Sequence, residues 1–138
     1  MDEQNIYDAY FAGIFDGEGS VTLVPKPNHK TYDVRVQVIN TSEWLCYQLY
    51  QRYGGWVGIH RRSNDRCKEV YHWYAACNSA KEFLNRILPF CFLKRPQAEL
   101  ALRVCSHKRK GRNQPQEYFD LERDFKELMT QMNKRGVS

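Results

Sequence analysis

The 138-residue chain lacks any long apolar run, and this absence excludes several classes of protein. No stretch approaches the roughly 20 consecutive apolar residues that a helix needs to span a bilayer. The first residues also lack the pattern of a secretory signal peptide. We therefore expect no membrane partner, and a location in the cytoplasm, the nucleoid or an organelle matrix rather than outside the cell.

Cysteine and histidine are sparse and irregularly spaced, which argues against a zinc protein. The five cysteines are an odd number, include no C-x-x-C pair, and mostly lie inside apolar segments, as reduced core cysteines do. The four histidines show no metal-ligand spacing either. The chain also has no internal repeat, so each motif described below is present once per chain.

Lysine and arginine are absent from the first 20 residues, which hold five acids. Residues 21–75 hold eight basic residues against four acidic ones, and residues 76–112 hold nine against two. The whole chain has a net charge of +5 and a pI near 9.0, so the charge balance favours an anionic partner. Basic charge is thus concentrated in the middle of the chain, next to an acidic N-terminal patch.

Hydrophobic periodicity predicts alternating helices and hairpins. Helices are expected over residues 2–15, 42–53, 79–88, 97–107 and 116–132, and strands over residues 20–26, 32–39, 56–62 and 68–76. The glycines after Phe15 should end the first helix, and Gly54-Gly55 the second. In the second helix we expect four residues to face inward, namely Trp44, Leu45, Leu49 and Tyr50.

These elements predict an α+β fold. Two hairpins would form a four-stranded antiparallel sheet with helices on one face, which leaves the other face open to a ligand. With 42% apolar residues, a chain of this length is expected to form one domain. Residues 1–107 would make its core, and residues 108–138 a solvated basic connector and a C-terminal helix packed on the same domain.

The most informative stretch, residues 10–20, places two carboxylates among glycines at the end of an apolar helix. A helix C-terminus carries partial negative charge, so Asp16 and Glu18 should each be destabilising there by roughly 0.3–1 kcal/mol unless a cation compensates. A divalent metal would do so.

The same helix carries small residues every fourth position, at Ala9, Gly13 and Gly17. This spacing puts them on one face and lets a second helix approach closely. Two such helices would bring their acidic ends together, so we expect a dimer interface that contains these three residues and Asp16.

The motif and several later stretches of the sequence resemble a known family. Residues 11–19, FAGIFDGEG, are similar at nearly every position to the signature of the LAGLIDADG homing endonucleases. Further stretches resemble the one-motif members in the same order, namely residues 36–41, 53–55, 88–90 and 93–100, so the resemblance covers about residues 7–107. It implies an αββαββα core and a homodimer that cleaves both strands of a long, roughly palindromic DNA site across the minor groove, leaving short 3′ overhangs.

The resemblance also implies a metal site. Phosphodiester hydrolysis by paired metals needs several oxygen ligands, and one Glu18 is too few. Two paired chains would place two Glu18 carboxylates side by side, with a Gly17 carbonyl from each as a further ligand. In the family the last acid of the motif binds Mg²⁺ at each scissile phosphate. Here Glu18 stands where Asp is commoner, and a structural role at the helix end is favoured for Asp16.

Two further residues match catalytic positions of the family. Asn40 matches a polar residue that positions water near the metal, although it is equally suited to be the N-cap of the next helix, with Glu43 completing a capping box. Lys94 matches a basic residue that tunes the metal-bound water or stabilises charge on the phosphate, and its alternative is an ordinary surface lysine. Trp44 stands where a second basic residue is sometimes found.

The open face of the sheet is the expected surface for duplex DNA, since side chains that alternate along strands can reach base edges in the major groove. Arg can read guanine bidentately and Gln can read adenine. Loop residues would contact phosphates. The expected readers are Thr22, Val24, Lys26, Asp33, Arg35, Gln37, His60, Arg62, Lys68, Val70 and His72, and the expected phosphate contacts are Lys30, Arg61, Asn64 and Arg66. The alternative for each is a solvated side chain.

The sequence thus predicts a Mg²⁺-dependent homing endonuclease, with two rival interpretations. One is an RNA-binding maturase that assists splicing of its host intron through the basic surface of residues 103–112. The other is a catalytically inactive DNA-binding regulator, which Trp44 leaves open. An acid at position 18 together with Lys94 favours the nuclease, because a maturase need not keep either residue.

Overall fold

The computed structural model describes residues 2–27, 30–60, 69–108 and 114–134. The elements in chain order are α1 (Glu3–Glu18), β1 (Gly19–Pro25), β2 (Tyr32–Asn40), α2 (Glu43–Tyr53), β3 (Trp56–His60), β4 (Val70–Ala76), α3 (Cys77–Ile87), the 3₁₀ turn η1 (Leu88–Phe90), α4 (Arg95–His107) and α5 (Gln116–Lys134). The fold is α+β with an αββαββα core and further C-terminal helices, as predicted. Within the described ranges, no helix has the length and apolar content to cross a membrane.

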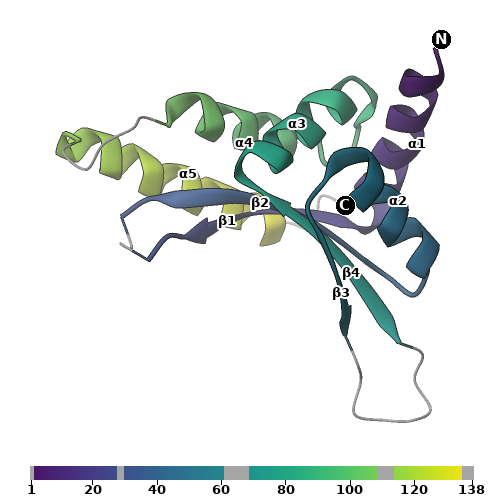
Figure 1. Ribbon diagram of the computed structural model, residues 1–138. Helices are drawn as coiled ribbons and strands as arrows, with labels where there is room; N and C mark the ends of the chain where they lie inside the picture. The colour runs from purple at the N-terminus through teal and green to yellow at the C-terminus, as the bar shows by residue number, and fades with distance from the viewer. Residues whose placement is uncertain (1, 28–29, 61–68, 109–113, 135–138) are drawn as a thin grey trace.

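The four strands form one sheet in the order β1-β2-β4-β3, with every neighbouring pair antiparallel. Helices α1 to α4 lie on one side of this sheet, and no described helix covers the other side (Figure 1). Alternation along the strands buries one face, at Val21 and Leu23, at Val34, Val36 and Val38, and at Trp73 and Ala75. The covered face therefore supplies the core, and the other face is free for a ligand.

Helix α1 runs three residues beyond the predicted end, through Gly17 and Glu18. A glycine inside a helix costs only about 1 kcal/mol relative to alanine, and burial of Phe11 and Phe15 on the inner face offsets it. The chain turns at Gly19 instead. A Cβ there would lie 2.2 Å from the Phe15 ring, so only glycine allows β1 to start this close to the helix.

Helix α2 is rotated relative to the prediction. Its buried residues are Leu45, Cys46, Leu49 and Tyr53, whereas Trp44 is 62% exposed and Tyr50 also faces solvent. The N-cap is Ser42, whose hydroxyl accepts a hydrogen bond from the Leu45 amide at 3.2 Å. The predicted N-cap role of Asn40 is therefore wrong. Asn40 closes strand β2, and its side-chain oxygen accepts from the Ser42 amide at 2.7 Å.

Helix α5 runs along the outer edge of the sheet and closes it. Lys126 Nζ donates to the carbonyl of Leu23, and Asn133 Nδ2 donates to the carbonyl of Val21, both at 2.9 Å. These side chains cap carbonyls on the free edge of β1, where another strand could otherwise pair. Figure 1 shows this helix beside β1 and β2.

Lys108 differs from the solvated connector residue that was expected. Its ammonium binds the carboxylate of Glu122 and the carbonyl of Tyr32. Glu122 is fully buried, so this charge must be paired to be tolerated inside the protein. The pair ties the start of the connector to α5 and to strand β2.

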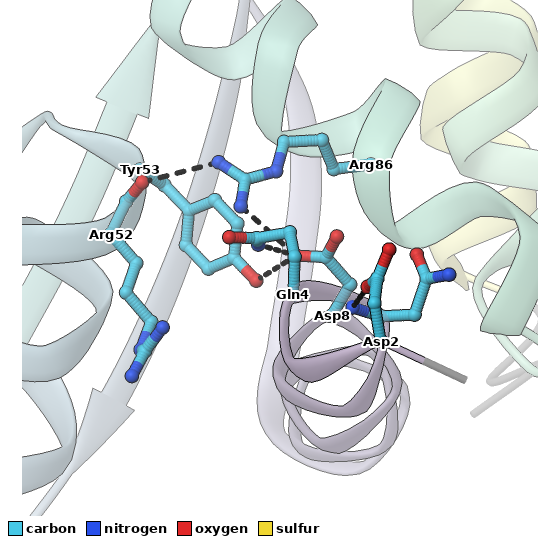
Figure 2. A network of polar contacts seen from close by, with 7 residues as sticks. Asp2, Gln4, Asp8, Arg52, Tyr53 and Arg86 are labelled. Carbon is cyan, nitrogen blue, oxygen red and sulfur yellow. Dashed lines mark hydrogen bonds and ion pairs between the residues drawn. The ribbon is translucent and has the colours of Figure 1, made fainter.

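A second buried acid, Asp8, joins three helices (Figure 2). Its carboxylate accepts hydrogen bonds from the Tyr53 hydroxyl at 2.7 Å and from Gln4 Nε2 at 2.9 Å, and it forms an ion pair with Arg86 at 3.4 Å. Arg86 also donates to the carbonyl of Arg52. Because every partner comes from α1, α2 or α3, this network fixes how the three helices pack.

The Tyr53→Phe substitution should destabilise the protein by about 1–2 kcal/mol, because it leaves the buried Asp8 carboxylate without one donor. Burial and the Asp8 carboxylate raise the pKa of Tyr53, so its hydroxyl stabilises the fold fully below about pH 10 and loses this effect as the pH rises further. The difference between wild type and variant should therefore shrink above pH 10.

Urea unfolding at pH 7 and above pH 10 measures this difference. The matched control is Tyr50→Phe, which removes an exposed hydroxyl from the same helix and should change the free energy of unfolding by less than about 0.5 kcal/mol. Equal stability of Tyr53→Phe and wild type at pH 7 would contradict the role assigned to the network.

Candidate functional site

Glu18 and Asn40 meet at one end of the sheet. Glu18 is the last residue of α1 and is exposed, and Asn40 is the last residue of β2. Strand β1 begins directly after Glu18 and pairs with β2, with Gly19 opposite Val38, so the two residues are brought side by side. Asn40 Nδ2 donates a hydrogen bond to Glu18 Oε2. Two of the three residues predicted to be catalytic therefore touch.

Asp16, the other acid of the motif, points into its own chain. Its carboxylate accepts hydrogen bonds from the backbone amides of Phe92 at 2.8 Å and Lys94 at 3.0 Å. Burial and this carboxylate together raise the pKa of the neighbouring Cys91 thiol to about 12. The charge of Asp16 is thus stabilised within the chain, as the expected structural role at the helix end requires, and its place in a dimer interface stays a prediction.

Lys94 is a buried residue, only 6% exposed, so the surface-lysine alternative does not apply. Its Nζ donates to the carbonyl oxygen of Asp16 at 3.2 Å, in the last turn of α1. A cation is favourable at a helix C-terminus because the last carbonyls carry partial negative charge. The negative charge at the end of α1, which the sequence predicts a metal to neutralise, is thus stabilised partly by Lys94 and by the amides that bind Asp16.

The described acids of one chain do not by themselves make a metal site. Among the described residues, no group of three His, Cys, Asp or Glu side chains could hold a metal. Asp16 is committed to backbone amides, which leaves Glu18 as the acid of the motif that faces solvent. Since Mg²⁺ takes six oxygen ligands, the remaining ones would have to come from a second chain, from a nucleic acid or from water.

The outer face of α1 is uncovered and apolar. A Cβ added at Gly13 or Gly17 would meet no atom within 4 Å, and the large side chains of Ile6 and Tyr10 are exposed beside them. Ala9, also on α1, is half-buried. Phe92, whose amide binds Asp16 at the end of α1, is 84% exposed. An apolar face of this kind is typical of a protein interface.

The register of the sheet places most of the predicted DNA readers on the open face. Opposite pairs are Thr22 with Arg35 and Val24 with Asp33, and Gln37 lies opposite Tyr74. Lys30 is exposed in the turn between β1 and β2. Lys26 follows the end of β1 rather than lying within it, and it forms an ion pair with Asp33 at 3.4 Å.

In the second hairpin, one predicted DNA contact is buried and five others lie outside the described residues. Val70 has the open-face parity of His72 but is only 6% exposed, so its side chain is buried and not available to DNA. His60 ends β3 and pairs with Val70 through the backbone. The remaining predicted positions, Arg61, Arg62, Asn64, Arg66 and Lys68, lie outside the described residues.

The sequence interpretation missed two aromatic residues on the open face, Tyr74 and Trp56. They lie opposite each other on β4 and β3, and their rings stack with centroids 5.4 Å apart. The guanidinium carbon of Arg35 lies 4.4 Å from the centroid of the Tyr74 ring. The alternation that selected His72 also selects Tyr74, two residues further along the strand, so the signal was present in the sequence.

Comparisons with known proteins find a DNA endonuclease of similar sequence. No family model matches the chain. The DNA endonuclease I-CreI of Chlamydomonas reinhardtii is 27% identical over 120 residues, which cover 81% of this chain and 70% of that protein. In this similarity and in the motif at residues 11–19, the chain resembles the LAGLIDADG homing endonucleases.

Solved structures of LAGLIDADG and other homing endonucleases share the fold. The homing endonuclease I-CvuI in complex with its target superposes with a TM-score of 0.75 at 19% identity, covering 94% of this chain and 83% of that one. The archaeal intron-encoded homing endonuclease I-Vdi141I complexed with DNA gives a TM-score of 0.70 at 15% identity, covering 94% and 86%. The LAGLIDADG homing endonuclease I-GzeII in complex with its DNA target gives 0.60 at 17% identity, covering 86% of this chain and 42% of that one.

Proposed function

We propose that this chain is a homodimeric, Mg²⁺-dependent, site-specific DNA endonuclease that makes double-strand breaks in a long, roughly palindromic site. The observation that carries the proposal is the position of Glu18. It is an exposed acid at the end of a helix whose outer face is small and apolar, so pairing two such helices brings two of these acids together.

The donor set suits a hard divalent cation. Glu18 and the Gly17 carbonyl of each of two chains would provide carboxylate and carbonyl oxygens, and phosphate oxygens of the DNA would add more. A bound Mg²⁺ would supply the activation of water and the neutralisation of charge that phosphodiester hydrolysis needs. I-CvuI has been solved with DNA in the presence of Ca and of Mg, which supports a divalent metal here.

Asn40 and Lys94 would support Glu18 in different ways. The hydrogen bond from Asn40 Nδ2 holds the Glu18 carboxylate in one orientation, which reduces the entropy lost when it binds a ligand. Lys94 holds a positive charge against the last turn of α1, where it would stabilise negative charge on the cleaved phosphate. Trp44 carries no charge, so Lys94 alone would stabilise the negative charge on the cleaved phosphate.

Each subunit would read one half of the DNA site with its open sheet face. The described candidates for base or phosphate contact are Thr22, Val24, Lys26, Lys30, Asp33, Arg35, Gln37 and His72. All of them except Lys26 and Lys30 lie on the sheet face that no described helix covers, and the net charge of +5 favours the polyanion. The second hairpin, which extends away from the helices in Figure 1, would add contacts further along the duplex.

Selection of cleaved molecules from a randomised duplex library, with and without Mg²⁺, tests this function. The expected result is a family of two-fold symmetric sites that are cut on both strands only when Mg²⁺ is present. Sites that are bound but never cut would instead support the inactive regulator. Recovery of no preferred duplex, together with binding of structured RNA, would support the maturase.

A further inference from the structure

Tyr74 occupies the centre of the open sheet face. It lies on β4, directly opposite Gln37 on β2 and directly opposite Trp56 on β3. The stacked rings of Trp56 and Tyr74 are inclined by 23°, and the Arg35 guanidinium lies over the Tyr74 ring. The Arg35–Tyr74–Trp56 stack therefore crosses three of the four strands.

The ring of Tyr74 contacts the guanidinium of Arg35. Among the described residues, Nε of Arg35 is buried without a hydrogen-bond partner, so no acceptor fixes this nitrogen. The distance of 4.4 Å to the ring centroid is well inside the range of a cation–π contact. A guanidinium stacked in this way keeps its N–H groups in its own plane, where they can still bind a ligand bidentately.

The neighbouring Gln37 is engaged differently. Its Oε1 lies 3.1 Å from Nε2 of His72. One end of the Gln37 amide is thus already used, and reading adenine bidentately needs both ends. A bidentate contact between Gln37 and adenine is therefore disfavoured while this hydrogen bond persists. Arg35 remains the candidate for bidentate reading on this part of the face.

We propose that Tyr74 is a positioning residue for DNA recognition, which orients the Arg35 guanidinium toward a guanine in the major groove, with Trp56 supporting the ring from the opposite strand. This inference rests on the proposed function, since it assumes that the open face contacts duplex DNA. The O6 and N7 atoms of guanine match the N–H fork of arginine. Stacking removes rotamer freedom before binding, so less entropy is lost when the contact forms.

The test is a binding selection from a randomised duplex library without Mg²⁺, so that the readout does not depend on cleavage. Wild type should select guanine at one position in each half-site. Tyr74→Leu should weaken that preference by about two- to tenfold, the size of a cation–π contact, and leave the other positions unchanged. Tyr74→Phe keeps the ring and should retain the preference. Arg35→Lys keeps the charge but removes the paired N–H donors of the guanidinium, so it should lose most of the guanine preference.

Trp56→Ala provides a second variant should Tyr74→Leu fold poorly, because Trp56 is more than half exposed. It should weaken the same guanine preference to a smaller extent. An unchanged guanine preference in both variants would overturn the inference, as would an equal loss of affinity at every position, which indicates a structural or phosphate-binding role.

The test separates this inference from the proposed function. Wild type that selects no duplex would overturn both. Wild type that selects a symmetric site while Tyr74→Leu leaves its profile unchanged would overturn the inference alone. A loss of single-stranded RNA binding in Tyr74→Leu, with duplex selection unaffected, would also overturn it, because the exposed rings would then act as a base-stacking platform.

Discussion

Glu18→Gln is expected to abolish DNA cleavage and leave DNA binding largely intact. Glutamine has nearly the same size and can still accept the hydrogen bond from Asn40, so the local structure should persist. What it loses is the negative charge that would bind a divalent cation. Several kilocalories of transition-state stabilisation are expected from such a metal, so the rate of strand cleavage should fall by about 10³-fold or more.

Cleavage is measured with a selected duplex and Mg²⁺, and binding with the same duplex in the absence of metal. Glu82→Gln is the matched control, since it removes one exposed acid from α3 without touching the motif, and it should cleave at the wild-type rate. If Glu18→Gln retained wild-type cleavage, Glu18 could not be a metal ligand. If it lost binding and cleavage together, the acid would have a structural role.

Gly13→Leu should split the proposed dimer without harming the folded chain. Gly13 is exposed, and a Cβ at this position meets no atom within 4 Å in the isolated chain. Leucine is also a better helix former than glycine by about 0.8–1 kcal/mol, so the monomer should be equally or more stable. Between two helices in close contact, however, a leucine would hold the backbones apart and leave the two Glu18 carboxylates too distant to share ligands.

Sedimentation of the free protein measures this effect. Wild type should have twice the 16.4 kDa mass of the chain, and Gly13→Leu should have the mass of one chain and no cleavage activity. Gln116→Leu adds the same side chain at an exposed position at the start of α5 and should remain dimeric. A dimeric Gly13→Leu protein would show that this face of α1 is not the interface.

The structure of residues 11–19 could largely be predicted from the sequence, because it depends on residues that are close together in the chain. The position of Glu18 close to a helix end, and of Gly13 on the outer face of that helix, follows from spacing alone, although the helix continues past the predicted end at Phe15 to Glu18. The burial of Asp16 could not be found in this way. Its amide donors, Phe92 and Lys94, are 76 and 78 residues away in the chain, and no local pattern shows that this loop reaches the end of α1.

Asn40 shows how local signals can compete. Its spacing from Glu43 fits a capping box, yet Ser42 caps the helix two residues later, and Asn40 at the end of β2 binds Glu18 at the end of α1. The role of Tyr74 was missed for a related reason. Its contacts with Arg35 and Trp56 depend on the register of two strand pairs, which alternation within one strand does not specify.

The most direct test of the proposal is strand cleavage by a mixed dimer that contains one wild-type and one Glu18→Gln chain, purified through a different tag on each. If both chains complete one metal centre, as we propose, the mixed dimer should cut neither strand of the selected duplex at an appreciable rate. Nicking of one strand at the wild-type rate would contradict the proposal, because it would show that each chain carries a complete active site of its own.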